Sequence, residues 1–473
     1  MRQYSDLYID GQWQPPAVAA PLTDVHGAAD GTVVARVPAG SAADVDRAVD
    51  AARTAFATWS LTSGAERGAL LTALGAELEA RADELAELLA EEVGMPRKMA
   101  RRVQVAGPLM ILGSYAKLAA EYEFSKEVGN SLVVREPAGV VGAILPWNYP
   151  LFLLVCKVAP ALAAGCTVVL KPADVAPGAS FVFAEACAAA GLPAGVFNLV
   201  AGGDEVGEAL AKHPGLDVVS FTGSTPVGAL VAAAASANIN RVALELGGKS
   251  ANIILDDADL EKAVTAGVNN AFLNSGQTCS AWTRMLVPAA LQDEACALAE
   301  KAVARLTVGH PMDDASRLGP LASAEQRDRV ASYIDIGVAE GARLVTGGPG
   351  VPDGVDPGGY YVKPTVFADV TPTMRIAREE IFGPVLSIMP YTDEDDAVRI
   401  ANDTEYGLHG GVFSADPDRA LAVARRLRTG QVDINGGAWN PLAPFGGYKK
   451  SGLGRELGEF GIEEFLETKS IQR

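Results

Sequence analysis

Residues 139–174 read GVVGAILPWNYPLFLLVCKVAPALAAGCTVVLKPAD, and this stretch decides the fold. Gly139–Leu145 is a short apolar run rich in β-branched residues, which favours a strand. Leu151–Ala164 is helix-like, and Thr167–Leu170 is strand-like again. A strand, a helix and a second strand in this order are typical of a parallel βαβ unit.

The same alternation continues downstream. Helix-like stretches are Ala179–Ala190, Glu205–Lys212 and Thr225–Ala235, and strand-like stretches are Val196–Val200, Val218–Phe221 and Arg241–Leu246. We therefore predict an α/β fold, a parallel sheet with helices on both faces. Ligands of such sheets bind beyond the carboxyl ends of the strands. The segments PWNYP, KPAD, FTGSTPVG and ELGGKS follow strands and should carry the cofactor chemistry.

Helices are expected before this region and a second α/β region after it. Ser41–Ser60 has apolar residues at helical spacing, with Ser41 and Asp44 as a capping-box-like start. Two further helical stretches follow, Ala65–Val93 and Arg97–Glu123. The second alternating region runs from about residue 250 to 447. The tail 461–473 ends in a strand-like EEFLETKSIQ, an edge that needs a partner, and another subunit is one candidate.

Composition narrows the function classes. A chain of 473 residues is too long for one core, so two or three domains are expected. Its formal charge of −19 makes nucleic acid and anionic membrane poor partners. Five cysteines without a disulfide-like spacing suggest a reducing compartment, and no signal peptide is seen at the N-terminus. The cytoplasm is the expected location.

Cys279 stands apart from the other cysteines. It lies in FLNSGQTCSAWTR, residues 272–284, among small and polar residues. The other four lie in runs of Ala, Val, Leu and Phe, where a cysteine is usually a small buried apolar residue: Cys156, Cys166, Cys187 and Cys296. The backbone around Cys279 is suited to expose a thiol, which matters chemically if it can become a thiolate and meet an electrophile.

Five segments in order complete the pattern: PWNYP at 146–150, LELGGKS at 244–250, the Cys279 segment, EEIFGPV at 379–385 and PFGGYKKSGLGRE at 444–456. Together they resemble the NAD(P)-dependent aldehyde dehydrogenase superfamily, from about Tyr8 to the C-terminus. The resemblance implies a Rossmann-type parallel-sheet cofactor domain, an α/β catalytic domain and a small β oligomerisation arm. Residues 1–114 and 138–247 would form the NAD-binding domain, 248–447 the catalytic domain, and 115–137 with 448–473 the arm and C-terminal strand.

The resemblance assigns the reaction to three residues. The Cys279 thiolate would attack an aldehyde to give a thiohemiacetal, and the side-chain amide of Asn148 with the Cys279 backbone N–H would stabilise the oxyanion. Hydride transfer leaves a thioester, which water activated by Glu245 would hydrolyse to the acid. Lys157 and Glu456 match polar positions linked in the family to proton relay. Taken alone, Asn148 could order a turn and Glu245 could be a satisfied buried carboxylate.

The resemblance also assigns the cofactor site. Lys171 and Asp174 match the pair that holds the adenosine ribose, and a carboxylate there favours NAD over NADP. Asp174 stands where the family usually has Glu, one methylene longer. The remaining predicted cofactor contacts are Pro146, Trp147, Gly203, Gly207, Phe221, Gly223, Ser224, Gly228, Leu246, Glu380 and Phe382. No metal site is predicted.

By the same alignment, mostly apolar or aromatic residues form the substrate funnel. They are Phe152, Cys156, Leu273, Ala281, Trp282, Trp439 and Phe445. An uncharged, hydrophobic aldehyde is therefore expected. Cys156 replaces a large aromatic of many relatives and would widen the funnel. Arg284 is assigned a structural role, because family members with different substrates carry arginine there.

Other functions stay open from the sequence. A CoA-acylating enzyme would pass the acyl group to CoA, but such relatives typically lack the general-base glutamate. A non-catalytic structural protein on this fold would not require Cys279, Glu245 and Asn148 together. A thioesterase or esterase using Cys279 would turn over without NAD. Family members associate as homodimers or homotetramers through the arm and the C-terminal strand, so the same assembly is expected here.

Overall fold

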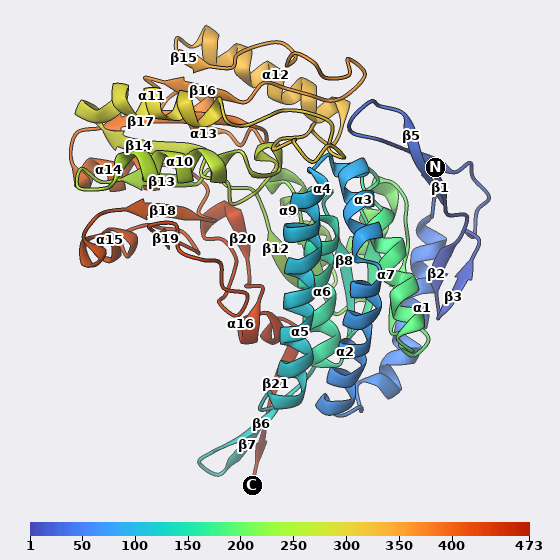
Figure 1. Ribbon diagram of the computed structural model, residues 1–473. Coiled ribbons are helices and arrows are strands. Elements are labelled where there is room, and N and C mark those ends of the chain that lie inside the picture. Colours follow the sequence, from blue (N-terminus) through green and yellow to red (C-terminus); the bar gives the residue numbers. More distant parts are fainter.

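The computed structural model describes residues 1–473 and contains two large sheets (Figure 1). The first sheet has eight strands in the order β20-β12-β11-β8-β9-β10-β2-β3. Its central strands are parallel, and β20, β2 and β3 are antiparallel to their neighbours. The bounds are β2 (Leu7–Ile9), β3 (Gln12–Gln14), β8 (Val140–Ile144), β9 (Thr167–Lys171), β10 (Phe197–Leu199), β11 (Val218–Thr222), β12 (Arg241–Glu245) and β20 (Gly452–Leu453).

The second sheet has seven strands in the order β15-β16-β17-β14-β13-β18-β19, all parallel except β15. The bounds are β13 (Ala251–Ile254), β14 (Arg284–Pro288), β15 (Arg343–Thr346), β16 (Thr365–Ala368), β17 (Val385–Tyr391), β18 (Gly410–Phe413) and β19 (Asp433–Ile434). The predicted α/β fold with parallel sheets is confirmed.

Helices cover both faces of the two sheets (Figure 1). Those in the N-terminal half are α1 (Ala42–Trp59), α2 (Gly64–Ala80), α3 (Ala82–Val93), α4 (Arg97–Met99), the π-helix η1 (Ala100–Val105), α5 (Ala106–Glu121), α6 (Pro150–Ala164), α7 (Gly178–Ala189), α8 (Asp204–Lys212) and α9 (Thr225–Ser236). Those in the C-terminal half are α10 (Leu260–Ala271), the 3-10 turns η2 (Leu273–Gly276) and η3 (Ala289–Leu291), α11 (Gln292–Val303), α12 (Ala324–Ala339), α13 (Arg375–Arg378), α14 (Glu394–Asn402), α15 (Pro417–Ala424), η4 (Lys449–Ser451) and α16 (Gly458–Glu463).

The N-terminal helices follow the sequence pattern with two differences. The capping box of Ser41 and Asp44 is present at the start of α1. The stretch predicted as one helix from Ala65 to Val93 is instead two helices that meet at Arg81, whose φ of −105° and ψ of 14° break the helical path. The stretch 97–123 contains α4, the π-turn η1 and α5 in succession. Tertiary packing decides the break at residue 81, where no Gly or Pro lies, whereas Gly107 and Pro108 lie close after η1.

We call the first sheet with its helices the first unit, and the second sheet with its helices the second unit. Helix α6 is the most deeply buried helix of the first unit. Every residue of α6 except Phe152 is buried, because the helix packs between the first sheet and α5. One hydrophobic core surrounds the first sheet, and two smaller cores lie against the second. The loop between β8 and α6 carries PWNYP to the junction of the two units.

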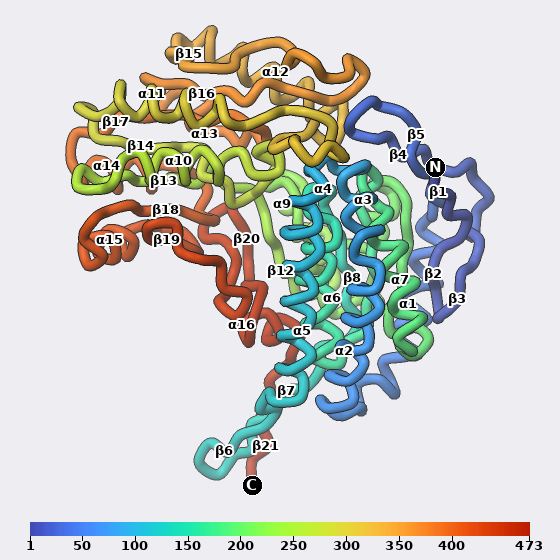
Figure 2. Tube along the Cα trace, viewed as in Figure 1, coloured from blue at the N-terminus to red at the C-terminus, as the bar shows by residue number.

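A three-stranded arm projects from the body of the molecule (Figure 2). It consists of β6 (Ser125–Val128), β7 (Ser131–Pro137) and β21 (Leu466–Gln472), with β21 antiparallel to β7. The C-terminal strand therefore has a partner within its own chain. The hairpin starts at Ser125, and residues 115–121 belong to the end of α5. A further small sheet near the N-terminus joins β1 (Arg2–Gln3), β4 (Thr23–His26) and β5 (Val33–Val37).

The helices of this chain are all unsuited to crossing a lipid bilayer. None is both long enough and apolar enough to span it. The apolar stretch 140–170 forms β8, α6 and β9 inside the first core instead.

Candidate active site

Cys279 lies in a loop whose backbone is unusually strained. The loop leaves η2 with three consecutive left-handed residues: Asn274, Ser275 and Gly276 have φ values of 54°, 46° and 63°. Glycine is required at the third position, because an added Cβ at Gly276 would lie 2.0 Å from the carbonyl oxygen of Gly383. Strained backbone of this kind tends to occur at functional sites. The turn brings the peptide bearing Cys279 toward the loop after β8.

Asn148 fixes the same loop from the first unit. Its side-chain Nδ2 donates to the carbonyl of Gln277 at 2.9 Å, and Nδ2 of Asn274 donates back to the carbonyl of Asn148 at 3.0 Å. Asn148 is 3% exposed. An amide nitrogen has two N–H groups. One donates to the carbonyl of Gln277, and the other makes no hydrogen bond within the protein.

The Cys279 thiol is partly exposed and lies in an electronegative environment. Burial raises the pKa of Cys279 well above its ordinary value, and the charges of Glu380, Glu245 and Glu456 raise it further, while the backbone N–H of Ser280 acts in the opposite direction. Three carboxylates are thus close enough to Cys279 to affect its ionisation.

Glu245 is a buried carboxylate with an unused oxygen. It ends β12, is 5% exposed, and its Oε2 has no hydrogen-bond partner. Burial raises the pKa of Glu245 well above its usual range, and Glu456 raises it further, whereas Lys157 and Arg455 lower it. A carboxyl group with a raised pKa and a free oxygen is suited to take a proton from water or a thiol.

Lys157 and Glu456 form a buried ion pair beside Glu245. The Nζ of Lys157 lies 2.9 Å from Oε1 of Glu456 and donates to Oγ of Ser220 at 3.1 Å. The Lys157 side chain is 1% exposed. Both residues act on the pKa of Glu245, so the two predicted relay positions are near the predicted base.

The predicted ribose pair lies at the carboxyl end of β9. The Nζ of Lys171 donates to Oδ1 of Asp174 at 3.3 Å. Burial raises the pKa of Asp174, and the charge of Lys171 opposes the rise. The closest atom to a Cβ built on Gly203 is Oδ2 of Asp174 at 3.9 Å, and a Cβ on Gly207 would meet nothing within 4 Å. Both glycines therefore face open space next to the pair.

Helix α9 offers its N-terminus after β11. Ser224 caps the helix, with its side chain accepting from the backbone N–H of Val227 at 3.4 Å. Gly228 packs under Leu246, because an added Cβ would lie 2.4 Å from its Cδ2. A Cβ on Gly223 would similarly meet the Phe221 ring at 2.4 Å. These small residues keep the chain close around a helix start that suits a phosphate.

Glu380 and Phe382 come from the second unit to the same junction. Oε1 of Glu380 accepts from the backbone N–H of Gly248 at 3.0 Å, and burial raises the pKa of Glu380 to about 7. Phe382 has a left-handed φ of 64°, rare for an aromatic residue. Its ring meets Trp147 edge-on at 5.4 Å. Pro146, beside Trp147, is partly exposed in the same loop.

These groups fit a dinucleotide. The carboxylates of Asp174 and Glu380 can accept from ribose hydroxyls, the α9 N-terminus can take pyrophosphate, and the glycines leave room for a backbone approach.

The predicted funnel residues divide into two groups. Phe152, the one partly exposed residue of α6, lies 5.8 Å from Trp439 between ring centroids, and Trp439 is 41% exposed. Phe445 and Leu273 are also partly exposed. The contact between Phe152 and Trp439 therefore presents an apolar surface. Cys156 and Ala281 are buried, at 2% and 4% exposure.

Trp282 is a correction to the predicted funnel. It is 2% exposed and packs in a core against the second sheet, with its ring 6.2 Å from Phe413. Its Nε1 donates to Nδ1 of His409 at 3.2 Å. The indole points into the protein because a polar partner for its N–H is buried there.

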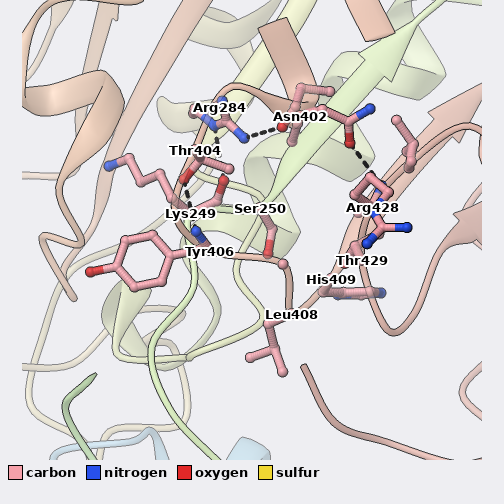
Figure 3. A pocket seen from close by; sticks show the side chains of 15 residues that line it. Lys249, Ser250, Arg284, Asn402, Thr404, Tyr406, Leu408, His409, Arg428 and Thr429 are labelled. Carbon is pink, nitrogen blue, oxygen red and sulfur yellow. Dashed lines mark hydrogen bonds between the residues drawn. The ribbon is translucent and has the colours of Figure 1, made fainter. Parts of the chain in front are cut away.

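A cavity close to the Cys279 loop is lined in part by two charged residues, Lys249 and Arg284 (Figure 3). Arg284 donates to the carbonyls of Lys249, Ile400 and Ala401, which gives it the structural role expected from the sequence. Lys249 is 2% exposed with no hydrogen-bond partner for Nζ, and burial lowers its pKa to about 7. Lys249 belongs to the ELGGKS segment, but nothing in the sequence indicates that its side chain is buried.

Comparisons with known proteins find related dehydrogenases over nearly the whole chain. A model of the aldehyde dehydrogenase family matches residues 13–471. The chain is 51% identical to a 3-succinoylsemialdehyde-pyridine dehydrogenase of a Pseudomonas species, over 100% of this chain and 99% of that protein.

Two solved structures are also similar. Aldehyde dehydrogenase C of Pseudomonas syringae, as a cysteine-to-alanine mutant complexed with NAD+ and octanal, has a TM-score of 0.98 and 49% identity, covering 99% of this chain and 96% of that one. An aldehyde dehydrogenase of Mycobacterium tuberculosis complexed with NAD+ has a TM-score of 0.97 and 45% identity, covering 100% and 98%.

Proposed function

Because this chain belongs to the aldehyde dehydrogenase family, we propose that it oxidises an uncharged, hydrophobic aldehyde to the carboxylic acid with NAD+. The observation that carries the proposal is the meeting of Asn148, Glu245 and Cys279 from three distant segments at one buried junction. Similarity to proteins whose structures hold NAD+, and in one case octanal, supports the cofactor and an apolar substrate.

Cys279 is the proposed nucleophile. Its sulfur forms a bond to the aldehyde carbon, and the free N–H of Asn148 with the Cys279 backbone N–H stabilises the resulting oxyanion. The proton of the thiol is released to solvent before the attack. When bound, NAD+ supplies the two-electron acceptor that converts the thiohemiacetal into a thioester. Lys171, Asp174, Glu380 and Phe382 would hold it.

Glu245 then completes the proposed cycle. It takes a proton from water, whose oxygen attacks the thioester carbon, and the bond between that carbon and the Cys279 sulfur breaks. Glu245 gives this proton to the departing sulfur, so the products are the carboxylic acid and the regenerated thiol, with Glu245 again a carboxylate. The ion pair of Lys157 and Glu456 lies beside Glu245; burial is the main cause of the raised pKa of Glu245, Glu456 raises it further and Lys157 lowers it.

The remaining parts of the proposal concern selectivity and assembly. The carboxylate of Asp174 accepts a ribose 2′-hydroxyl and repels a 2′-phosphate, which favours NAD over NADP. We also propose a cytoplasmic homodimer or homotetramer built through the arm, with residues 1–114 and 138–247 as the cofactor domain and 248–447 as the catalytic domain.

The test follows NADH with a panel of aldehydes, with and without CoA. Wild type should form NADH with apolar aldehydes without needing CoA, and Cys279→Ala should form none. Cys296→Ala, a buried cysteine in the second unit, is the matched control and should keep activity. Glu245→Gln should give a burst of about one NADH per active site, then slow turnover, because an amide cannot take the proton from water.

Each rival predicts a different outcome. A rate that depends on CoA would favour the CoA-acylating enzyme. Ester hydrolysis with no NADH from any aldehyde would favour the esterase, and no reaction at all the structural protein. Equal steady-state rates for wild type and Glu245→Gln would remove Glu245 from the role of base.

A further inference from the structure

The π-turn η1 buries a polar side chain next to the loop after β8. Gln104 in this turn is completely buried, whereas its apolar neighbour Val103 is partly exposed. A buried amide beside a half-buried valine reverses the usual arrangement of polar and apolar residues. Such reversals, and π-turns within helices, are frequent at functional sites.

Gln104 reaches the backbone of Asn148. Its Nε2 donates to the carbonyl oxygen of Asn148 at 3.2 Å and lies 3.7 Å from the sulfur of Met95. Nδ2 of Asn274 donates to the same carbonyl at 3.0 Å, so both lone pairs of this oxygen are used. The Asn148 peptide is therefore held by Gln104 from the first unit and by Asn274 from the second.

Packing alone does not require an amide at position 104. The Oε1 of Gln104 is buried and has no hydrogen-bond partner, which is unfavourable for an acceptor. The opposite orientation of the amide would place this oxygen against the carbonyl oxygen of Asn148, so that two acceptors would face each other. A leucine would fill most of the same space without leaving a polar atom unpaired. The hydrogen bond to Asn148 is thus the interaction that needs the glutamine.

The π-turn decides which side chain faces Asn148. The backbone N–H of Ala106 donates to the carbonyl of Arg101, five residues earlier. Pro108 has no N–H for the carbonyl of Gln104, four residues before it, so an α-helical hydrogen bond cannot form there. One residue more or less in a helix rotates the following side chains by about 100°. A regular helix through this segment would therefore present a different side chain to the loop after β8.

We propose that Gln104 is a positioning residue for the oxyanion donor: it holds the Asn148 backbone so that the side-chain Nδ2 keeps its place beside the Cys279 loop. This Nδ2 donates to the carbonyl of Gln277, two residues before Cys279, at 2.9 Å. A shift of the Asn148 peptide moves the donor relative to that loop, and a misplaced donor stabilises an oxyanion less. The inference rests on the proposed function in giving Asn148 the role of donor.

The test is a double-mutant cycle that follows NADH formation with octanal as the probe. Gln104→Leu removes the hydrogen bond and should lower kcat about 10-fold, while the KM for NAD+ stays within about twofold of wild type. In an Asn148→Ala background, the same substitution should change kcat by less than about twofold, because the donor that Gln104 positions is already absent.

Gln104→Glu separates positioning from packing. A protonated glutamic acid can donate its O–H to the Asn148 carbonyl, whereas a carboxylate cannot donate. Burial raises the pKa of a carboxyl group, as it does for Glu92 in the same unit. The kcat of Gln104→Glu, divided by that of wild type at each pH, should therefore be close to one at low pH and fall to the ratio of Gln104→Leu as pH rises.

Thr167→Val is the matched control. Thr167 is also completely buried, and its hydroxyl donates to a backbone carbonyl, that of Ala52, at 3.0 Å. It lies at the start of β9, at the opposite end of the strand from Lys171. The variant should melt at a lower temperature and keep the wild-type kcat.

Hydrogen–deuterium exchange of the cofactor-free enzyme gives a readout that does not need turnover. Peptides covering residues 145–150 and 272–280 should exchange faster in Gln104→Leu than in wild type, because Asn148 joins these two loops. Thr167→Val should leave the exchange of both peptides unchanged.

The outcomes distinguish this inference from the proposed function. A wild-type kcat in Gln104→Leu, or a loss of the same size in the Asn148→Ala background, would overturn the inference. So would a Gln104→Glu variant that is as slow as Gln104→Leu at every pH. If Gln104→Leu does not fold, the pH series of Gln104→Glu decides. No NADH from wild type with any aldehyde would defeat the proposed function instead, and exchange in the two loops would then show whether Gln104 holds Asn148.

Discussion

Glu92 is a carboxyl group inside the first unit whose ionisation affects stability away from the active site. It is 1% exposed, and its Oε2 accepts from the backbone N–H of Gly178 at 3.1 Å. Burial raises the pKa of Glu92 to about 8, and the contact with Gly178 opposes the rise. Between about pH 4.5 and 8 the unfolded chain loses a proton that the folded chain keeps, so the free energy of unfolding falls as pH rises.

Glu92→Gln should remove this loss. Gln is neutral and can still accept from Gly178, so the variant should match wild type near pH 4.5 and exceed it by about 1–3 kcal/mol at pH 8.5. Thermal melting at several pH values measures the difference. Glu91→Gln is the control, because Glu91 has a 38% exposed side chain paired with Arg2. A Glu92→Gln advantage that does not grow with pH would contradict the expectation.

Individual residues differ in how well the sequence predicts them. Cys279, Glu245 and Asn148 lie in short motifs, so the local sequence is enough to predict a role for each of them. Trp282 was misplaced because its orientation depends on His409, which is 127 positions away in the chain. The burial of Lys249 and the pairing of His409 with Asp433 likewise depend on the packing of separate strands. Such contacts leave no local signal in one sequence.

At the scale of elements, we expect the turn from η2 to Cys279 to tolerate amino-acid substitution least. Gly276→Ala adds a left-handed strain of about 1–3 kcal/mol and a clash with the carbonyl of Gly383 that costs a similar amount. The variant should lose most NADH formation and melt at a lower temperature. Gly191→Ala is the matched control: φ is 77°, yet an added Cβ would meet nothing within 4 Å. It should lose about 1 kcal/mol and keep activity.

The strands and helices of the parallel region were predictable within about two residues, because hydrophobic period and Gly or Pro punctuation coincide there. Helix α6, predicted as Leu151–Ala164, runs from Pro150 to Ala164. The break at Arg81 was not predictable, since Ala- and Leu-rich sequence favours continuous helix, whereas Gly107 and Pro108 lie close to the π-turn η1. The left-handed Asn274 and Ser275 follow from contacts with Asn148 and Gly319.

At the scale of the whole molecule, the arm has little core of its own. Every residue of β21 except Leu466 is exposed, and so is every residue of β6. A sheet of this size needs a covered apolar face for stability. We expect a second copy to cover it, as the proposed homodimer or homotetramer requires.

Removing residues 468–473 tests this expectation. The deletion removes the pairing of β21 with β7 from Thr468 opposite Arg135 to Gln472 opposite Ser131. It keeps the ion pair of Arg241 with Glu467. Light scattering after gel filtration should show a smaller particle than the full chain. Circular dichroism controls for folding. An unchanged mass, or a monomeric full-length chain, would contradict the role given to the arm.

The ion pair of Lys157 and Glu456 joins residues 299 positions apart, and the late segment that supplies Glu456 also supplies β20 for the first sheet. A nascent chain on the ribosome therefore carries Cys279 and Glu245 long before it carries the partner of Lys157. The first sheet and the surroundings of Glu245 are therefore complete only once residues 452–456 have been synthesised.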